Sequence, residues 1–236
     1  MVQYAKQKSA SGRVEITTNG VLLSAELGRS LINAGLSKLF ISIQATSSEG
    51  YKKVTGKHID LKKLVRDIEH FYQNKGDCQV YIKIADTSLE DERDEEKFFK
   101  IFGDFCDEIA VEQIDKFFEN AIDAKPKTTG CYGQPIVEKA VCTFLFTRLV
   151  ICSDGSAVAC CMDWSRRNII GNTSTERLYD IWHGKELRDL QLTHLQRNRH
   201  LIPICKDCYA PGSICIDNID EYADALYMKL QGQELR

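Results

Sequence analysis

The sequence has no run of apolar residues that approaches the roughly 18 needed to span a bilayer. Its opening segment, Met1 to Gly12, also lacks the apolar core of a signal peptide. Positive charge is not in excess, because 31 basic residues are matched by 34 acidic ones, and this argues against a broad basic face for nucleic acid. No internal repeat of solenoid length is present. We therefore expect a cytoplasmic globular protein with no membrane and no nucleic-acid partner.

Cysteine, by contrast, is abundant, with ten among 236 residues. Disulfides do not persist in the cytoplasm, so burial, metal ligation or redox chemistry must account for these thiols. Seven of the ten lie between Cys142 and Cys215. The cysteines are therefore the feature from which a function can be argued.

The first 115 or so residues alternate β-rich runs with amphipathic helical stretches, the pattern of a parallel sheet built from βαβ units. The fold class indicated is α/β. The predicted strands are Val14–Thr18, Leu39–Ile43, Gln79–Ala85 and Glu108–Gln113. Helices are predicted over Leu23–Ala34, from Leu61 to near Asn74–Gly76, and over Leu89–Phe105, and a loop rich in Ser, Thr and Gly is predicted after the second strand.

Composition changes after this pattern ends. We expect a first domain over residues 1–118, a polar linker over 119–138 and a second, small domain over 139–236. In the second domain, Asp154-Gly155 predicts a hairpin between strands in Phe144–Ile151 and Ala157–Cys161. Helices are predicted over Glu176–His183 and Lys185–Gln196, with a last amphipathic helix from Ile219 to Leu230.

Two well-separated pairs of cysteines can supply the four thiolates of a tetrahedral metal or iron–sulfur site. One pair is the CxxC of Cys205 and Cys208, and the other is Cys142 and Cys160, which bracket the hairpin as CX12GX4C. Residue types alone do not separate a zinc site from a [4Fe–4S] cluster, since both accept four thiolates.

The neighbours Cys160 and Cys161 would point to opposite faces of a strand, so we expect only one of them to be a ligand. A regular hairpin favours Cys161, whereas a bulge favours Cys160. The remaining cysteines are expected to be buried as small apolar side chains, and Cys215 is a candidate spare or exchangeable ligand.

The order of motifs in the second domain resembles the SPASM, or shortened twitch, auxiliary-cluster domain of radical SAM enzymes. The matching positions are Cys142, Asp154-Gly155, Cys160-Cys161, Gly171-Asn172, Leu178–Trp182 and the pair Cys205 and Cys208. The longer SPASM form continues with CX5CX3C and holds two clusters, but here only Cys215 follows. The resemblance therefore implies one auxiliary [4Fe–4S] cluster with Cys142, Cys160, Cys205 and Cys208 as ligands.

The first domain resembles part of a radical SAM core, which is a partial (β/α)6 barrel. Glu15–Gly20 looks like the third strand of such a barrel and Phe40–Gln44 like the fourth, so residues 14–115 would be strands three to six. The resemblance implies that Thr18, Asn19 and Ser42 contact S-adenosylmethionine. Gln44 stands where many members of the family have Asp.

The CxxxCxxC motif that holds the SAM-binding cluster in this family is absent, because no three cysteines here have that spacing. We therefore expect an N-terminally truncated piece of a longer enzyme that cannot cleave SAM by itself. For the complete enzyme the resemblance implies SAM, a second [4Fe–4S] cluster, and an electron donor such as flavodoxin or ferredoxin. It also implies a small-molecule or peptide substrate modified by a 5′-deoxyadenosyl radical, with the auxiliary cluster transferring electrons.

Two outcomes are typical of this family, namely oxidation of an alcohol or aminocyclitol and modification of a peptide. The sequence does not identify a catalytic residue. The alternative from a different functional class is a non-enzymatic scaffold or interaction module that binds zinc through four cysteines.

Overall fold

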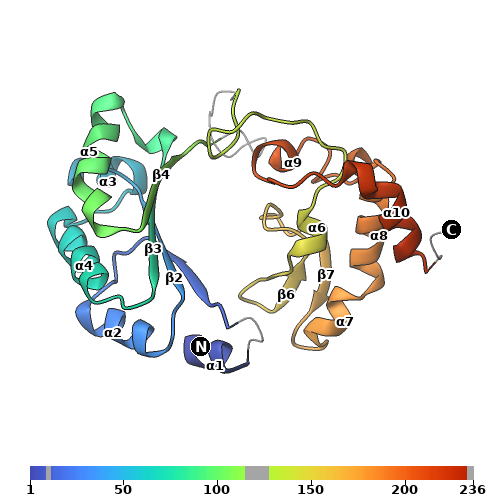
Figure 1. The fold of residues 1–236 in the computed structure, drawn as a ribbon, viewed down its shortest axis with the longest axis horizontal. Helices are drawn as coiled ribbons and strands as arrows, with labels where there is room; N and C mark the ends of the chain where they lie inside the picture. Colours follow the sequence, from blue (N-terminus) through green and yellow to red (C-terminus); the bar gives the residue numbers. More distant parts are fainter. Residues whose placement is uncertain (9–11, 115–127, 233–236) are drawn as a thin grey trace. The chain divides into compact units, whose positions relative to one another are not determined.

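A computed structural model describes residues 1–8, 12–114 and 128–232 of the chain. The chain divides into two compact units, Met1–Ile114 and Asp115–Arg236 (Figure 1). The predicted domain limits at residues 118 and 139 stay predictions, and residues 119–127 of the predicted linker lie outside the described residues. Each unit is described by itself below.

The N-terminal unit is built on a four-stranded parallel sheet with the order β1-β2-β3-β4. Its strands are β1 (Glu15–Thr18), β2 (Lys38–Ile43), β3 (Gln79–Ala85) and β4 (Glu108–Glu112). The four strands predicted from the sequence are thus present within one residue at each end. Sequential parallel pairing requires a crossover between each pair of strands, and helices supply these crossovers.

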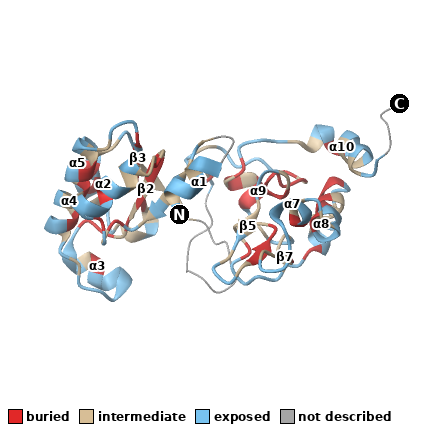
Figure 2. Cartoon of the chain, turned by 90° about the horizontal axis from the view of Figure 1, so that it is seen from below, coloured by how far each residue is buried: buried red, intermediate tan, exposed pale blue. Residues whose placement is uncertain are grey.

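Helices α2 (Ala25–Asn33), α3 (Ser48–Thr55), α4 (Leu61–Gln73) and α5 (Glu92–Phe102) lie on one side of this sheet (Figure 1). The strands alternate, so every second residue faces these helices and is buried, as in the sets Leu39, Ile41, Ile43 and Val80, Ile82, Ile84. These side chains pack against Leu64, Ile68 and Phe71 of α4 and Phe98 and Phe102 of α5. The buried layer appears in red between helices and strands in Figure 2.

Helix α3 occupies the segment for which the sequence predicted a loop, so that prediction was wrong. Ser47 caps its first turn, because the Ser47 Oγ accepts a hydrogen bond of 3.0 Å from the Gly50 amide. Gly56 ends the helix in the left-handed conformation, with φ of +69°. Tyr51, at 1% exposure, anchors the helix in the core. A single apolar anchor gives no helical periodicity, which is why the pattern was missed.

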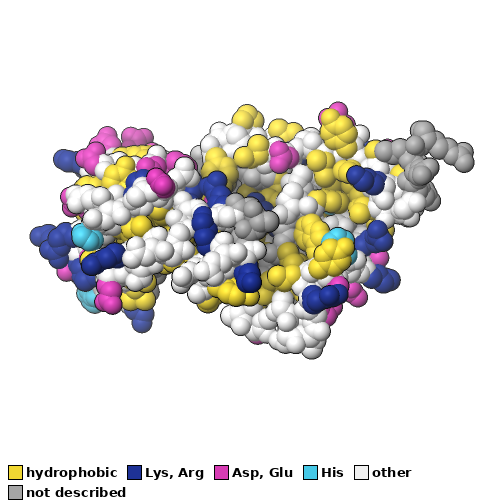
Figure 3. All heavy atoms as spheres, turned by 60° about the horizontal axis from the view of Figure 1, so that its bottom comes forward, with side chains coloured by type: hydrophobic (Ala, Val, Ile, Leu, Met, Phe, Trp, Pro, Cys, Tyr) yellow, Lys and Arg dark blue, Asp and Glu magenta, His cyan; other side chains and the backbone are white. Residues whose placement is uncertain are grey.

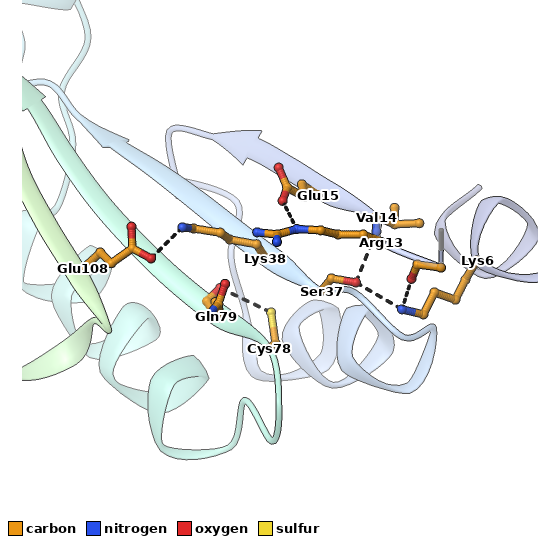
Figure 4. Close-up of polar contacts among 10 residues, drawn as sticks. Lys6, Arg13, Val14, Glu15, Ser37, Lys38, Cys78, Gln79 and Glu108 are labelled. Carbon is orange, nitrogen blue, oxygen red and sulfur yellow. Dashed lines mark hydrogen bonds and ion pairs between the residues drawn. The ribbon is translucent and has the colours of Figure 1, made fainter. Parts of the chain in front are cut away.

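Polar contacts hold the amino-terminal edge of the sheet (Figure 4). The Ser37 hydroxyl accepts from the Val14 amide at 3.2 Å and from the Lys6 ammonium at 3.1 Å, which ties helix α1 (Val2–Lys8) to the sheet. Lys38, only 7% exposed, forms an ion pair of 2.8 Å with Glu108 two strands away. Short 3-10 turns, η1 (Asp86–Ser88) and η2 (Gly103–Phe105), flank helix α5.

The C-terminal unit contains a small antiparallel sheet of the strands β5 (Val150–Ile151), β6 (Ser156–Val158) and β7 (Ile169–Asn172). The predicted hairpin turn is present, but its strands are shorter than expected. Residues Phe144–Thr147 form a helical turn, α6, in place of a strand. Cys160 and Cys161 follow β6 in a turn, so the strand parity that predicted opposite faces does not apply to them.

Helices complete this unit: α7 (Leu178–Trp182), α8 (Lys185–Leu195), α9 (Ala210–Ser213) and α10 (Ala223–Leu230), with the 3-10 turns η3 (Arg199–Leu201) and η4 (Asp220–Tyr222). The predicted helices at 176–183, 185–196 and 219–230 correspond to α7, α8 and α10. Leu145, Ile170, Ile181 and Leu187 form a core between the sheet and α7 and α8.

On the face shown in Figure 3, charged side chains of both signs are interspersed, and hydrophobic side chains reach the surface over much of the C-terminal unit. Among the described hydrophobic side chains of the C-terminal unit, Ile216, Trp164 and Tyr179 are the most exposed. Within residues 1–8, 12–114 and 128–232, the helices are all too short or too polar to cross a membrane.

The close packing of α2 on α4 at Gly28 predicts that a larger residue at this position destabilises the unit. A β-carbon at Gly28 would lie 2.9 Å from Cδ2 of Phe71, which is itself 2% exposed. Gly28→Ala should therefore lower the free energy of unfolding by about 1–3 kcal/mol, although alanine normally stabilises a helix. A β-carbon at Gly103 would have no heavy atom within 4 Å, so Gly103→Ala should raise the free energy of unfolding by about 0.4–1 kcal/mol. Urea unfolding of both variants tests this contrast, and a stabilised Gly28→Ala would contradict the packing.

Candidate iron–sulfur site

Three separate segments of the C-terminal unit bring four cysteines to one cavity of about 30 Å³. Cys142 precedes α6, Cys160 follows β6, and Cys205 and Cys208 follow η3. The rest of the cavity wall is mostly apolar, with Leu145, Ala159, Met162, Leu190, Ile204, Ala210 and Pro211. The four cysteines chosen from the sequence thus lie together, although residues 142 and 208 are far apart in the chain.

The segment before Cys142 is held by hydrogen bonds to its backbone. The two carboxylate oxygens of Asp220 accept from the amides of Ala140 and Val141, each at 2.9 Å. The Cys142 amide donates to Nδ1 of His194 on α8 at 3.2 Å. These contacts fix an irregular segment that no strand or helix supports.

The turn that carries Cys160 is organised by Asp163, which is 3% exposed. Its carboxylate accepts from the amides of Arg167 at 2.9 Å and Asn168 at 2.7 Å. Its own amide donates to the Cys160 carbonyl at 3.1 Å. The Cys160 Sγ in turn accepts from the Met162 amide at 3.3 Å, which orients the sulfur.

Arg199 holds the CxxC segment. Its Nη1 donates to the carbonyl of Cys205 at 2.7 Å and to the carbonyl of Cys208 at 3.2 Å. The Cys205 amide donates to the carbonyl of Ile202 at 2.9 Å, closing a turn just before the pair. A guanidinium that binds both carbonyls keeps the two thiols on one side of this turn.

Burial keeps these thiols protonated in the absence of a cation. It raises the pKa of Cys205 to about 12 and also raises the pKa of Cys208. The pKa of Cys142 is raised by a hydrogen bond with Cys215 and by burial. The pKa of Cys160 is raised by a hydrogen bond with Cys161 and by burial. A metal centre would supply the positive charge that four buried thiolates require.

Two further cysteines lie beside the cavity without lining it. Cys161 accepts a hydrogen bond of 3.3 Å from Nη1 of Arg148, whose guanidinium stacks 3.6 Å from the centre of the Phe144 ring. Cys215 is 4% exposed, with its sulfur 3.9 Å from that of Cys142. Of the cysteines expected to be buried, Cys78 is buried, whereas Cys106, Cys131, Cys152 and Cys161 are partly exposed.

The donor set fits a cluster better than a single ion. A zinc ion holds each sulfur about 2.3 Å away, so its four sulfurs lie about 4 Å apart. In the described part of the chain, no group of three or more His, Cys, Asp and Glu side chains is placed to hold one metal ion. A cluster binds each thiolate to a different iron and therefore suits thiols spread around a cavity.

The region that contains the four cysteines is similar to a known protein domain. Residues 142–209 match the family model of SPASM, an iron–sulfur cluster-binding domain. This region is similar to a SPASM domain. The matched range begins at Cys142 and extends just past Cys208, so it contains all four cysteines of the cavity. The resemblance of this region to a SPASM domain is thereby confirmed.

Two solved structures have a similar fold. One is BtrN in complex with AdoMet and 2-DOIA, with a TM-score of 0.51, 15% identity, and coverage of 88% of this chain and 64% of that one. The other is SuiB from Streptococcus suis bound to S-adenosylmethionine, with a TM-score of 0.58, 14% identity, and coverage of 79% and 50%. The likeness is one of fold, an α/β architecture with a parallel sheet, and the chain spans only 50–64% of these proteins. No curated protein sequence gave a significant match.

The residues expected to contact SAM lie in the N-terminal unit, apart from the SPASM domain. Asn19 is exposed just beyond β1, and its side chain accepts from the Val21 amide at 3.1 Å. Thr18 pairs in register with Ile41, so its side chain is on the helix-covered face, whereas Ser42 is on the opposite face. The Thr18 hydroxyl accepts from the Gly20 amide at 3.1 Å. The three residues therefore end neighbouring strands, but their side chains do not share one face.

The open face of the sheet holds an ion pair that sequence analysis did not identify. Lys83 is adjacent to Ser42 in register, and its ammonium lies 2.7 Å from the Glu112 carboxylate on β4. Glu112 lies at the end of a predicted strand, and this position could have indicated an acidic partner for Lys83. Three supports of the SPASM cavity were also missed, namely His194, Arg199 and Asp220, because nothing in their spacing links them to the cysteines.

Asp220 provides a test of how the Cys142 segment is held. Asp220→Asn keeps the size of the side chain but replaces one of its two accepting oxygens with a donor. The free energy of unfolding of the C-terminal unit should fall by about 1–3 kcal/mol, because one buried amide loses its charged partner. Asp217→Asn, at an exposed neighbouring position, is the matched control. Denaturant unfolding measures both, and equal effects would show that the Asp220 contacts do not support the segment.

Proposed function

We propose that the SPASM domain binds one [4Fe–4S] cluster through Cys142, Cys160, Cys205 and Cys208. The observation that carries this proposal is that these four cysteines, and neither Cys161 nor Cys215, line the same apolar cavity. A bound cluster of this type supplies one-electron transfer. With four cysteines as ligands, no iron is left open for a substrate, which favours an electron-transfer role.

The residues around the cavity have distinct parts in this proposal. Leu145, Met162 and Leu190 exclude water, and a dry environment strengthens every charge interaction inside it. Asp163 binds the backbone that follows Cys160, and Asp220 binds the backbone that precedes Cys142. Arg199 binds the carbonyl groups of the CxxC turn. The SPASM domain of this chain would be the one-cluster, twitch-like form, with a small α+β layout.

We further propose that the chain is part of a radical SAM oxidoreductase or maturase. Its four-stranded sheet would then be strands three to six of a partial barrel, whose interior is the face that carries Ser42 and the Lys83–Glu112 pair. Asn19 and Ser42 would contact SAM with their side chains, and Thr18 with its backbone. The substrate would be a small molecule such as an alcohol or aminocyclitol, or a peptide.

The whole enzyme would hold a second [4Fe–4S] cluster and take electrons from a carrier such as flavodoxin or ferredoxin. We place it in the cytoplasm, because its ten cysteines are free thiols, as in a reducing compartment. The alternative, a zinc scaffold, is less well supported, since the four thiols are not placed around a single ion.

Anaerobic reconstitution with iron and sulfide tests the ligand set. The wild-type chain should become brown and bind about four irons. Cys160→Ala should abolish this binding, because it removes a sulfur from the cavity wall, whereas Cys161→Ala should retain it. Iron content and visible absorbance are the readouts. Retention by Cys160→Ala with loss in Cys161→Ala would reverse the assignment, and a colourless protein with one zinc would establish the scaffold.

We also expect that the chain does not cleave SAM by itself. The reconstituted chain, given dithionite and SAM, should form no 5′-deoxyadenosine, because no three of its cysteines have the CxxxCxxC spacing. Chromatography with mass detection measures the product, and a radical SAM enzyme that contains this motif serves as the positive control. Turnover by this chain would show that a cluster it binds can reduce SAM.

A further inference from the structure

His194 lines the SPASM cavity and has a buried ring nitrogen that no group in the described structure satisfies. The side chain comes from helix α8, is 1% exposed, and lines the cavity together with the four cysteines. Its Nε2 is buried and has no hydrogen-bond partner among the described residues. A buried polar atom without a partner is uncommon in native proteins and indicates a group that is still to be bound.

The hydrogen bond at the other ring nitrogen defines what Nε2 can do. Nδ1 accepts from the Cys142 amide at 3.2 Å, so Nδ1 carries no proton. A neutral ring must then carry its proton on Nε2. His194 is therefore an oriented N–H donor in the cavity wall.

Resting on the proposed function, we infer that His194 donates a hydrogen bond from Nε2 to a sulfur of the bound cluster and thereby raises its reduction potential. The cavity walls near this donor are apolar apart from the cysteines, Asp163, Asn168 and Arg199. Reduction adds negative charge to the cluster, and a donor aimed at a sulfur stabilises that charge. The same ring also positions Cys142, because Nδ1 accepts from its amide. His194 therefore has two roles, which are to hold one ligand and to tune the reduction potential of the cluster.

Two isosteric variants separate these two roles. In His194→Asn, the side-chain oxygen can take the place of Nδ1, which keeps the acceptor for the Cys142 amide and removes the Nε2 donor. In His194→Gln, the longer amide reaches the position of Nε2, which keeps a donor in the cavity and removes the acceptor. His200→Asn, at an exposed position outside the cavity, is the control.

The decisive measurement is the reduction potential of the reconstituted chain, from a redox titration monitored by electron paramagnetic resonance. His194→Asn should make reduction about tenfold less favourable, which is about 59 mV for one electron. His194→Gln and His200→Asn should stay close to wild type. Unchanged potentials in all variants, or equal shifts for Asn and Gln, would overturn the inference while leaving cluster binding intact.

A measurement on the cluster-free chain gives a second, independent readout. His194→Asn removes a buried donor that lacks a partner, so its midpoint of urea unfolding should be no lower than that of wild type. His194→Gln should have a lower midpoint, because the Cys142 amide loses its acceptor. A lower midpoint for Asn than for Gln would contradict an unsatisfied Nε2. A wild-type chain that takes up no iron would overturn the proposed function and, with it, this inference.

Discussion

Four thiol groups from three separate segments meet in one apolar cavity, and the C-terminal unit is arranged around this convergence. Burial opposes ionisation of the thiols, as the raised pKa values of Cys205 and Cys208 show. Such a cavity gains stability from a cation that turns the thiols into thiolates, since the binding of metal and the folding of a small domain are then coupled. The small sheet and short helices of this unit supply a modest core, which makes that coupling more important.

Charged and polar side chains stabilise the irregular segments that carry the cysteines. Asp220 binds the backbone before Cys142, Asp163 binds the turn after Cys160, and Arg199 binds the turn of the CxxC pair. Each of these groups satisfies backbone atoms that neither a helix nor a strand would satisfy. His194 does the same for Cys142, and its second ring nitrogen is buried without a partner among the described residues.

In the N-terminal unit, the helices of the unit cover only one of the two faces of the parallel sheet. The helix-covered face is mostly apolar, while the other face carries Ser42, Tyr81, Lys83 and Glu112 in a half-buried setting. Parallel sheets are normally covered on both faces, so side chains of mixed polarity there are typical of a face that lines a ligand site.

The sequence by itself determined the parallel sheet, because alternating and helical apolar patterns are local and strong. Through the order of its motifs, the sequence also indicated Cys142, Cys205 and Cys208 as cavity residues, but its residues left the choice between Cys160 and Cys161 open. It did not determine helix α3, the turn at Cys160 and Cys161, or the face on which Thr18 lies, because capping and register depend on neighbours in space. Only the tertiary structure placed Arg199 and His194 beside the thiols, since contacts between distant segments leave no characteristic spacing in the sequence.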